Sequence, residues 1–232
     1  MRRLLLTTAL LGAIGASPAI AADSALVIWN TSDPLGAETA TGTGSASILS
    51  SNLDGVTVSV SSVQKGTNPN DLTEANINID NTTGSVQTLK IIAGANGYVG
   101  PTTGFTLTGT IGSTLGGADL VGQYFADASN SLNGQSLSVT GTGLNSFNSG
   151  PLTGPQSFSF NGVGLDNLLA PYGLAEELTL TLQPGASVFV QGVSMDAVNT
   201  VPEPSTWAML IAGFGLIGAL GWHKKRTPRF AV

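Results

Sequence analysis

Apolar and small polar residues alternate with a period of two along much of the chain. The pattern is clearest at residues 56–60, 75–79, 158–160 and 178–182, where Val, Ile, Phe or Leu alternates with Thr, Ser or Asn. Such alternation turns one face of a strand toward a core and the other toward water. Further strands are predicted near residues 25–29, 86–92, 105–110, 137–141 and 187–190. We therefore expect antiparallel strands that each have one buried face.

Turn-forming residues separate these segments. Residues 183–186 read Gln-Pro-Gly-Ala, which puts Pro and Gly at the two central positions of a type II turn and predicts a hairpin between residues 178–182 and 187–190. Short helices are predicted only at residues 117–128 and 165–170, and the Ser, Thr and Gly repeats of residues 39–45 predict a loop. The predicted fold of the body is therefore mainly β, an antiparallel β-sandwich of jelly-roll-like type.

The first 22 residues are typical of a secretory signal peptide. Arg2 and Arg3 precede an apolar run, and Ala19, Ala21 and Ala22 supply the small residues of a cleavage site. Cleavage is expected after Ala21 or Ala22, so that residues 1–22 form a signal helix that is removed and residues 23–200 form the exported body. A retained N-terminal anchor is the alternative, but the apolar run is too short to span a bilayer.

Residues 202–232 contain three parts in a fixed order, followed by a short tail. Pro202, Glu203 and Pro204 come first and predict a stiff, extended peptide, because each Pro fixes φ and disfavours helix at the residue before it. Residues 206–222 are then predicted to form a single transmembrane helix, whose marked positions are Trp207, Gly213, Gly215, Gly218 and Trp222. A basic stop at residues 223–226 contains Lys224, Lys225 and Arg226, and residues 227–232 form a short cytoplasmic tail. The positive-inside rule places the Pro-Glu-Pro motif on the outer side of the membrane.

This tail resembles the PEP-CTERM sorting domain of Gram-negative bacteria over residues 201–226. The resemblance implies that the chain is a substrate of an exosortase, a membrane-embedded cysteine transpeptidase that cleaves near the motif. Proteins with such tails are usually exported and associated with exopolysaccharide, biofilm or floc matrix. The implied partners are the exosortase, the secretion translocon, signal peptidase and the inner membrane, with exopolysaccharide as a further candidate. Residues 227–232 depart from the pattern, since such tails commonly end sooner.

The charge of the body excludes one class of partner. Of 14 acidic residues only Glu203 lies outside residues 23–200, and of 8 basic residues only Lys65 and Lys90 lie inside, which leaves 13 acids, 2 bases and a net charge of −11. A nucleic-acid surface needs Lys and Arg for phosphates. Nucleic acid is therefore not an expected partner.

The residue types needed for most catalysis are missing from the body. The chain has no Cys, and its single His, His223, lies in the tail, so Ser-His-Asp, Cys-His and common transition-metal sites are not expected. Two carboxylates could serve a glycosidase, but Glu176 and Glu177 are predicted to point to opposite faces of a solvated strand entry. The remaining candidates are isolated in sequence: Asp54, Asp119, Asp127, Asp166 and Asp196. We predict no enzyme and no cofactor.

Two kinds of binding site have candidate residues in the body, a calcium site and a sugar site. Calcium suits a chain rich in Asp and Asn, and the weak candidates are Asn70, Asp71 and Asp80, with neighbours Asn68, Asn78 and Asn81. Neither group matches the EF-hand loop, so turn formation explains them better and no metal is predicted. Sugar binding would need exposed aromatic side chains, for which the candidates are Trp29, Tyr98, Tyr124 and Tyr172.

Three functions follow from these patterns. The first is an exported structural or interaction protein that is transiently membrane-anchored, processed by an exosortase, and delivered to the cell surface or exopolysaccharide matrix. The second is a calcium-assisted carbohydrate-binding module or weak glycosidase at the cell surface. The third is a permanently membrane-anchored periplasmic protein.

Overall fold

The body is a two-layered β-sandwich. The computed structural model describes residues 23–67, 70–99, 102, 104–115, 117–152, 154–163, 168, 171–198, 211–212 and 214. Within these residues the strands are β1 (Ser24–Asn30), β2 (Asp33–Gly42), β3 (Ser45–Leu53), β4 (Val56–Thr67), β5 (Asn70–Asn81), β6 (Gln87–Tyr98), β7 (Gly104–Leu115), β8 (Ala118–Asp127), β9 (Thr142–Asn148), β10 (Gln156–Val163), β11 (Tyr172–Leu182) and β12 (Ser187–Val198).

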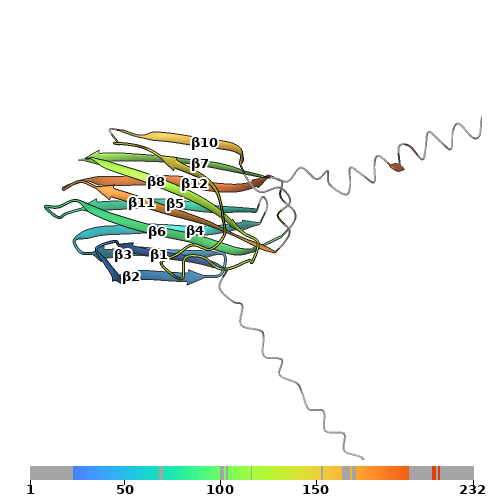
Figure 1. Cartoon of the computed structure of the whole chain (residues 1–232), viewed down its shortest axis with the longest axis horizontal. Coiled ribbons are helices and arrows are strands. Elements are labelled where there is room, and N and C mark those ends of the chain that lie inside the picture. The colour runs from blue at the N-terminus through green and yellow to red at the C-terminus, as the bar shows by residue number, and fades with distance from the viewer. Residues whose placement is uncertain are drawn as a thin grey trace, which may run out of the picture.

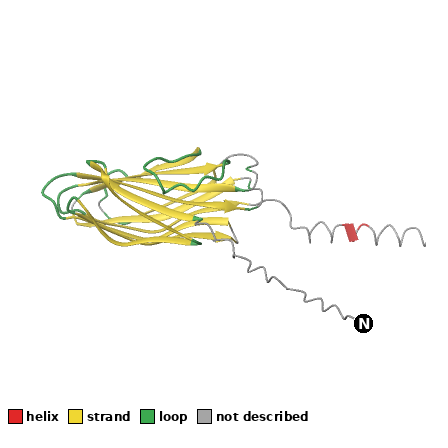
Figure 2. Cartoon of the chain, turned by 90° about the horizontal axis from the view of Figure 1, so that it is seen from below, coloured by secondary structure: helices red, strands yellow, loops and turns green. Residues whose placement is uncertain are grey.

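The strands form two six-stranded sheets that lie face to face (Figures 1 and 2). Sheet A has the order β2-β1-β6-β11-β8-β9, and sheet B has the order β10-β7-β12-β5-β4-β3. Every strand pairing in the described residues is antiparallel. The predicted antiparallel β-sandwich is therefore confirmed.

Period-two alternation explains most strands, including one that was predicted as a helix. Residues 117–128 were predicted to be helical, but the structure places Ala118–Asp127 in β8. Leu120, Gly122 and Tyr124 point into the core while the residues between them are partly or fully exposed. The helix prediction was wrong because this alternation fits a strand, and pairing with β11 and β9 completes the backbone hydrogen bonds.

The predicted hairpin at residues 183–186 is right about the turn and wrong about the pairing. The Ala186 amide donates to the Gln183 carbonyl over 3.0 Å, and Gly185 has a φ of 73°, as a type II turn requires. However, β11 lies in sheet A and β12 in sheet B, so the turn carries the chain from one layer to the other. Asn81 holds the turn, because its side-chain amide donates to the carbonyls of Leu182 and Gln183.

One segment predicted as a loop is a strand, and one segment predicted as a strand is a loop. Residues 39–45, predicted as a loop, lie mainly in β2 and at the start of β3. Residues 137–141, predicted as a strand, belong to the loop 128–141 that crosses the outer face of sheet A. Val139 of this loop packs against Val27, Trp29 and Ile92 in a small second core. The loop buries these outward-facing side chains, which is why its own apolar residues do not need a strand partner.

The main core fills the space between the sheets. The first and last described residues of the body lie at the same end of the sandwich. Asp23 precedes β1 and forms a 3.1 Å salt bridge with Lys65 near the end of β4. In sheet B the end of β12 is paired with the start of β5, where Asp196 lies opposite Asp71. The Tyr98 hydroxyl of sheet A donates to the Asp71 carbonyl of sheet B, so the two sheets contact each other at this same end.

Some predicted elements fall outside the described residues. The signal helix and most of the predicted transmembrane helix are among them, although Ile211, Ala212 and Phe214 are helical. No helix in the described part of the chain has the length and hydrophobicity needed to cross a membrane. The predicted helix at residues 165–170 is described only at Leu168, which forms an isolated β-bridge with Thr102.

Candidate functional site

Two glutamates from opposite sheets lie in the interior of the sandwich. Glu74 is on β5 of sheet B and is 1% exposed, and Glu176 is on β11 of sheet A and is 2% exposed. Glu74 lies between Val63 of β4 and Val193 of β12 in the sheet register. Because these neighbours are apolar, neither of them supplies a counter-charge to Glu74.

The surroundings of Glu176 in sheet A are similar. Its register neighbours are Ala93 of β6 and Tyr124 of β8, and both are buried. Glu177, the next residue, points to the outer face of sheet A and pairs with Lys90 at 2.5 Å. The two adjacent glutamates therefore point to opposite faces as predicted. The prediction that both are solvated was wrong for Glu176, because β11 is a central strand whose inner face is fully covered.

A local change of face explains why Glu74 points inward. On β5, Ile77 and Ile79 are buried, so strict alternation would turn Glu74 outward. The alternation shifts by one residue between positions 74 and 77, and the partner strands shift at the same level. Val60 and Val63 are both buried on β4, as are Val190 and Val193 on β12, where Gly192 has a φ of 58°. This shared kink turns Glu74 into the core.

Burial favours the protonated form of the two carboxyl groups. Burial raises the pKa of Glu74 to about 8. Burial, together with the charge of Glu74, raises the pKa of Glu176 well above its usual range. Burial and the two glutamates also raise the pKa of Tyr124. Within the described residues, both carboxyl oxygens of Glu74 and Oε1 of Glu176 have no hydrogen-bond partner, which favours the neutral form of each group.

The arrangement does not suit attack on a sugar. A glycosidase needs two carboxyl groups on either side of a substrate ring, whereas both of these side chains are almost completely shielded from solvent. Sequence reasoning did not find this pair because the two residues are about a hundred positions apart and lie in different sheets. No signal in the alternation pattern identified Glu74, since the kink reverses the face on which it lies.

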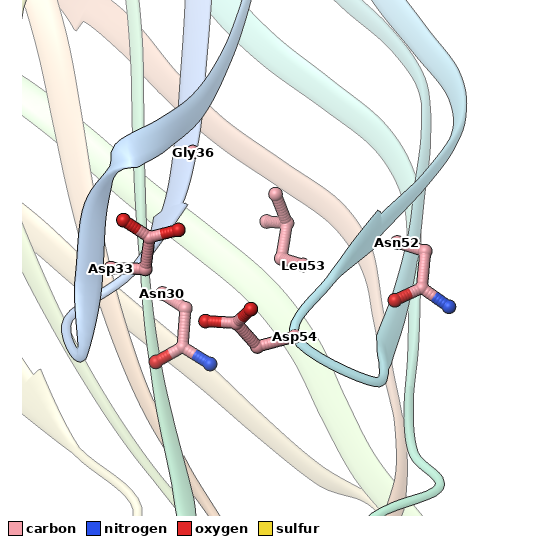
Figure 3. A pocket seen from close by; sticks show the side chains of 6 residues that line it. All are labelled: Asn30, Asp33, Gly36, Asn52, Leu53 and Asp54. Atoms are coloured by element: carbon pink, nitrogen blue, oxygen red, sulfur yellow. The ribbon is translucent and has the colours of Figure 1, made fainter.

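A second group of polar residues lines a pocket of about 70 Å³ between the β1–β2 and β3–β4 turns (Figure 3). Its lining residues are Asn30, Asp33, Gly36, Asn52, Leu53 and Asp54. The turns already use the amide oxygens, because Asn30 Oδ1 accepts from Ser32 and Asn52 Oδ1 accepts from the Gly55 amide. In the described part of the chain, no three acidic, His or Cys side chains come together as a metal site would require.

The weak calcium candidates do not come together. Asp71 and Asp80 lie near opposite ends of β5, about 30 Å apart at 3.3 Å per residue. Asp71 accepts a hydrogen bond from the Thr73 hydroxyl over 2.8 Å, and Asn81 serves the turn after β11. The side chain of Asn70 lies outside the described part. These contacts of Asp71 and Asn81 are therefore local ones within the protein.

The predicted aromatic platforms are all buried. Tyr98, Tyr124 and Tyr172 are 0% exposed and Trp29 is 5% exposed. Tyr98 stacks on Tyr172 with ring centroids 5.6 Å apart, and the Lys65 ammonium lies 5.5 Å from the centre of the Tyr98 ring. The prediction that these residues could form a sugar-binding surface was wrong, because apolar rings are stabilised most by burial in the core.

The sorting and cleavage residues lie outside the described part of the chain. This applies to Ala19, Ala21, Ala22, Pro202, Glu203, Pro204, Trp207, Gly213, Gly215, Gly218, Trp222, Lys224, Lys225 and Arg226. The structure does define where the body ends. The last strand, β12, ends at Val198, whose carbonyl accepts a 3.0 Å hydrogen bond from the Thr102 hydroxyl.

Comparison with known proteins identifies the tail and leaves the body unassigned. Residues 200–226 match the family model of the PEP-CTERM protein-sorting motif. No curated protein matches the chain. Among solved structures, that of TmCBM61 in complex with β-1,4-galactotriose is similar, with 6% identity, a TM-score of 0.37, and coverage of 63% of this chain and 91% of that chain. A TM-score this low supports no conclusion about the ligand of the present chain.

Proposed function

We propose that this chain, which carries a PEP-CTERM protein-sorting motif at residues 200–226, is an exported structural or interaction protein that an exosortase processes. Its destination is the cell surface or the exopolysaccharide matrix. The match to the sorting motif is the observation that carries this proposal. We assign the reaction to the processing enzyme, with Pro202, Glu203 and Pro204 as the recognised peptide, and we assign no reaction to the body.

The geometry of the body is compatible with this route. Asp23, the first described residue, and Val198, the last residue of β12, lie at the same end of the sandwich. A signal peptide before Asp23 and a membrane segment after residue 200 would therefore both join the body on the side that faces the membrane. The sandwich can remain folded while either segment is anchored.

The connection between the body and the motif is short. Pro202 follows Val198, the last residue of β12, by four positions, and four residues span at most about 14 Å. Thr102 fixes the carbonyl of Val198, so the described end of β12 is held in the sheet. A processing enzyme that binds the motif therefore works close to the folded sandwich.

The test is a double substitution in the motif, Pro202→Ala with Pro204→Ala. Without the two prolines the peptide loses its fixed extended geometry, so unprocessed full-length protein should accumulate in the membrane fraction. Cell fractionation and the mass of the C-terminus measure this outcome. The control is Pro34→Ala with Pro151→Ala, which removes two exposed prolines from the body and leaves the motif intact.

Two results would contradict the proposal. One is normal processing of the motif variant. The other is recovery of wild-type protein outside the cell with Phe230, Ala231 and Val232 still attached, because an exosortase substrate loses this end. An intact C-terminus in protein that stays in the membrane would instead support a permanently anchored periplasmic protein.

A further inference from the structure

The glutamate pair in the core has no role in export or sorting, yet its placement is costly. A buried carboxylate without a partner is strongly disfavoured. The groups around the pair supply no positive charge. The described neighbours of Glu74 and Glu176 in the sheet register are Val63, Val193, Ala93 and Tyr124.

The two lysines of the body are engaged elsewhere. Lys65 pairs with Asp23 at 3.1 Å at the end of the sandwich, and Lys90 pairs with Glu177 on the outer face of sheet A. Tyr124 is the remaining titratable group that faces the pair, and its hydroxyl also carries no charge near neutral pH. Only protons can therefore neutralise the two carboxyl groups.

We propose that Glu74 and Glu176 form a proton latch between the two sheets, by which we mean that the sheets pack with full stability only while both carboxyl groups are protonated. The folded sandwich is then most stable in acidic surroundings and less stable as the pH rises. The two carboxyl groups come from opposite layers, so their ionisation places like charges between sheet A and sheet B. This property is independent of the sorting function. It matters for an exported body because its surroundings are not buffered by the cytoplasm.

The direction of the pH effect follows from proton binding. The folded state holds a proton on Glu74 with a pKa of about 8, whereas the ordinary value for Glu is 4.5. A group with a raised pKa in the folded state contributes its full stability below the unfolded value and loses that stability as the pH rises through the folded value. The latch therefore weakens between about pH 4.5 and pH 8.

The experiment is thermal unfolding of the purified full chain in detergent at pH 5, 7 and 9. We expect the Tm of the wild type to fall by about 8 to 15 °C from pH 5 to pH 9. A pKa raised from 4.5 to about 8 lowers the stability by about 1.4 kcal/mol per pH unit between these values, and each kcal/mol corresponds to about 2 to 4 °C in a protein of this size. Glu74→Gln and Glu176→Gln should each reduce this dependence. Glu177→Gln, which alters the neighbouring residue on the outer face, should leave it unchanged.

Measurements at high salt distinguish the effect of the latch on stability from general repulsion among the acidic residues of the body. Repulsion between exposed charges is screened by salt, whereas a buried pair is screened much less. The loss of stability should therefore persist at 1 M NaCl. A wild-type Tm that is independent of pH, a dependence that salt abolishes, or an unchanged dependence in the Gln variants would each overturn the proposal.

A direct measurement covers the case in which the Gln variants do not fold. The chain has only five glutamates, Glu38, Glu74, Glu176, Glu177 and Glu203, so selective ¹³C labelling of the Glu carboxyl groups gives few NMR signals. At pH 6.5 the folded full chain should show at least one protonated Glu carboxyl, and unfolding should abolish that signal. Five ionised signals in the folded chain would refute the latch.

Discussion

Gly94 lies in the centre of β6, where the loop 128–141 crosses the outer face of sheet A. A Cβ atom at this position would lie 2.5 Å from the carbonyl oxygen of Asn133. The loop cannot easily move away, because Asn130 of the loop is hydrogen-bonded to β6: its Oδ1 accepts from the Gly97 amide over 2.6 Å and its carbonyl accepts from Asn96 Nδ2 over 3.2 Å. The absence of a side chain at Gly94 therefore allows the loop to cover Trp29 and its neighbours.

We predict that Gly94→Ala lowers the free energy of unfolding by about 1 to 3 kcal/mol, the usual cost of overpacking. Chemical denaturation of the variant and the wild type measures this difference. Gly84→Ala is the matched control, because nothing lies within 4 Å of a Cβ atom at that position, and it should change stability by less than about 0.5 kcal/mol. Equal effects of the two substitutions would show that the loop does not depend on Gly94.

At the scale of elements, the kink shared by β4, β5 and β12 decides which residues enter the core. Each strand changes its buried face at the same level, so that Val63, Glu74 and Val193 lie in one buried row and Val60, Ile77 and Val190 in another. On β12 the change occurs at Gly192, whose φ of 58° lies in the left-handed region. Side chains other than Gly adopt this conformation only at a cost.

We predict that Gly192→Ala destabilises the sandwich by about 1 to 2 kcal/mol, because Ala is strained at this φ. Nothing lies within 4 Å of a Cβ atom at Gly192, so the cost is conformational and steric crowding does not contribute. Gly192→Asn should cost less, since Asn tolerates the left-handed region better. Urea unfolding of the two variants tests the order. If Asn proves as costly as Ala, backbone strain at the kink is not the reason.

At the scale of the whole molecule, the proposed processing by an exosortase would take place only a few residues after the sandwich. The motif begins four residues after Val198, and Thr102 ties that residue to the sheet. An enzyme that must hold an extended peptide around Pro202 therefore meets the folded end of the body. Steric hindrance of this kind slows binding without changing the motif itself.

We predict that ten Gly and Ser residues inserted between Asn199 and Thr200 increase the rate of C-terminal processing, because a flexible linker moves the motif away from the body. Pulse-chase labelling followed by separation of the processed and unprocessed forms gives the rate. The same insert between Gly150 and Pro151, in the exposed connection after β9, is the control and should leave the rate unchanged. A rate that is unaltered or slower with the first insert would argue against hindrance by the sandwich.

Much of this architecture could be predicted from local patterns. Alternation at residues 56–60 and 178–182 identified strands, because side chains of a strand point to opposite faces whatever its partners are. The turn at residues 183–186 was identified because Pro and Gly restrict the backbone directly. The same reasoning failed for β8, whose alternation was missed. It also failed for residues 137–141, where Val139 packs on the outer face of sheet A without any strand pairing and Leu137 is exposed.

The sequence by itself determined the sandwich class, the acidic charge of the body, and the sorting motif at residues 200–226, because these depend on residue types and their spacing along the chain. Only the tertiary structure decided that β11 and β12 lie in different sheets and that Glu74 and Glu176 are both buried in the core. Strand pairing depends on competition among segments far apart in the chain. Which face of the sheet a side chain takes at a kink depends on the strands paired with it, and the local sequence does not identify those strands.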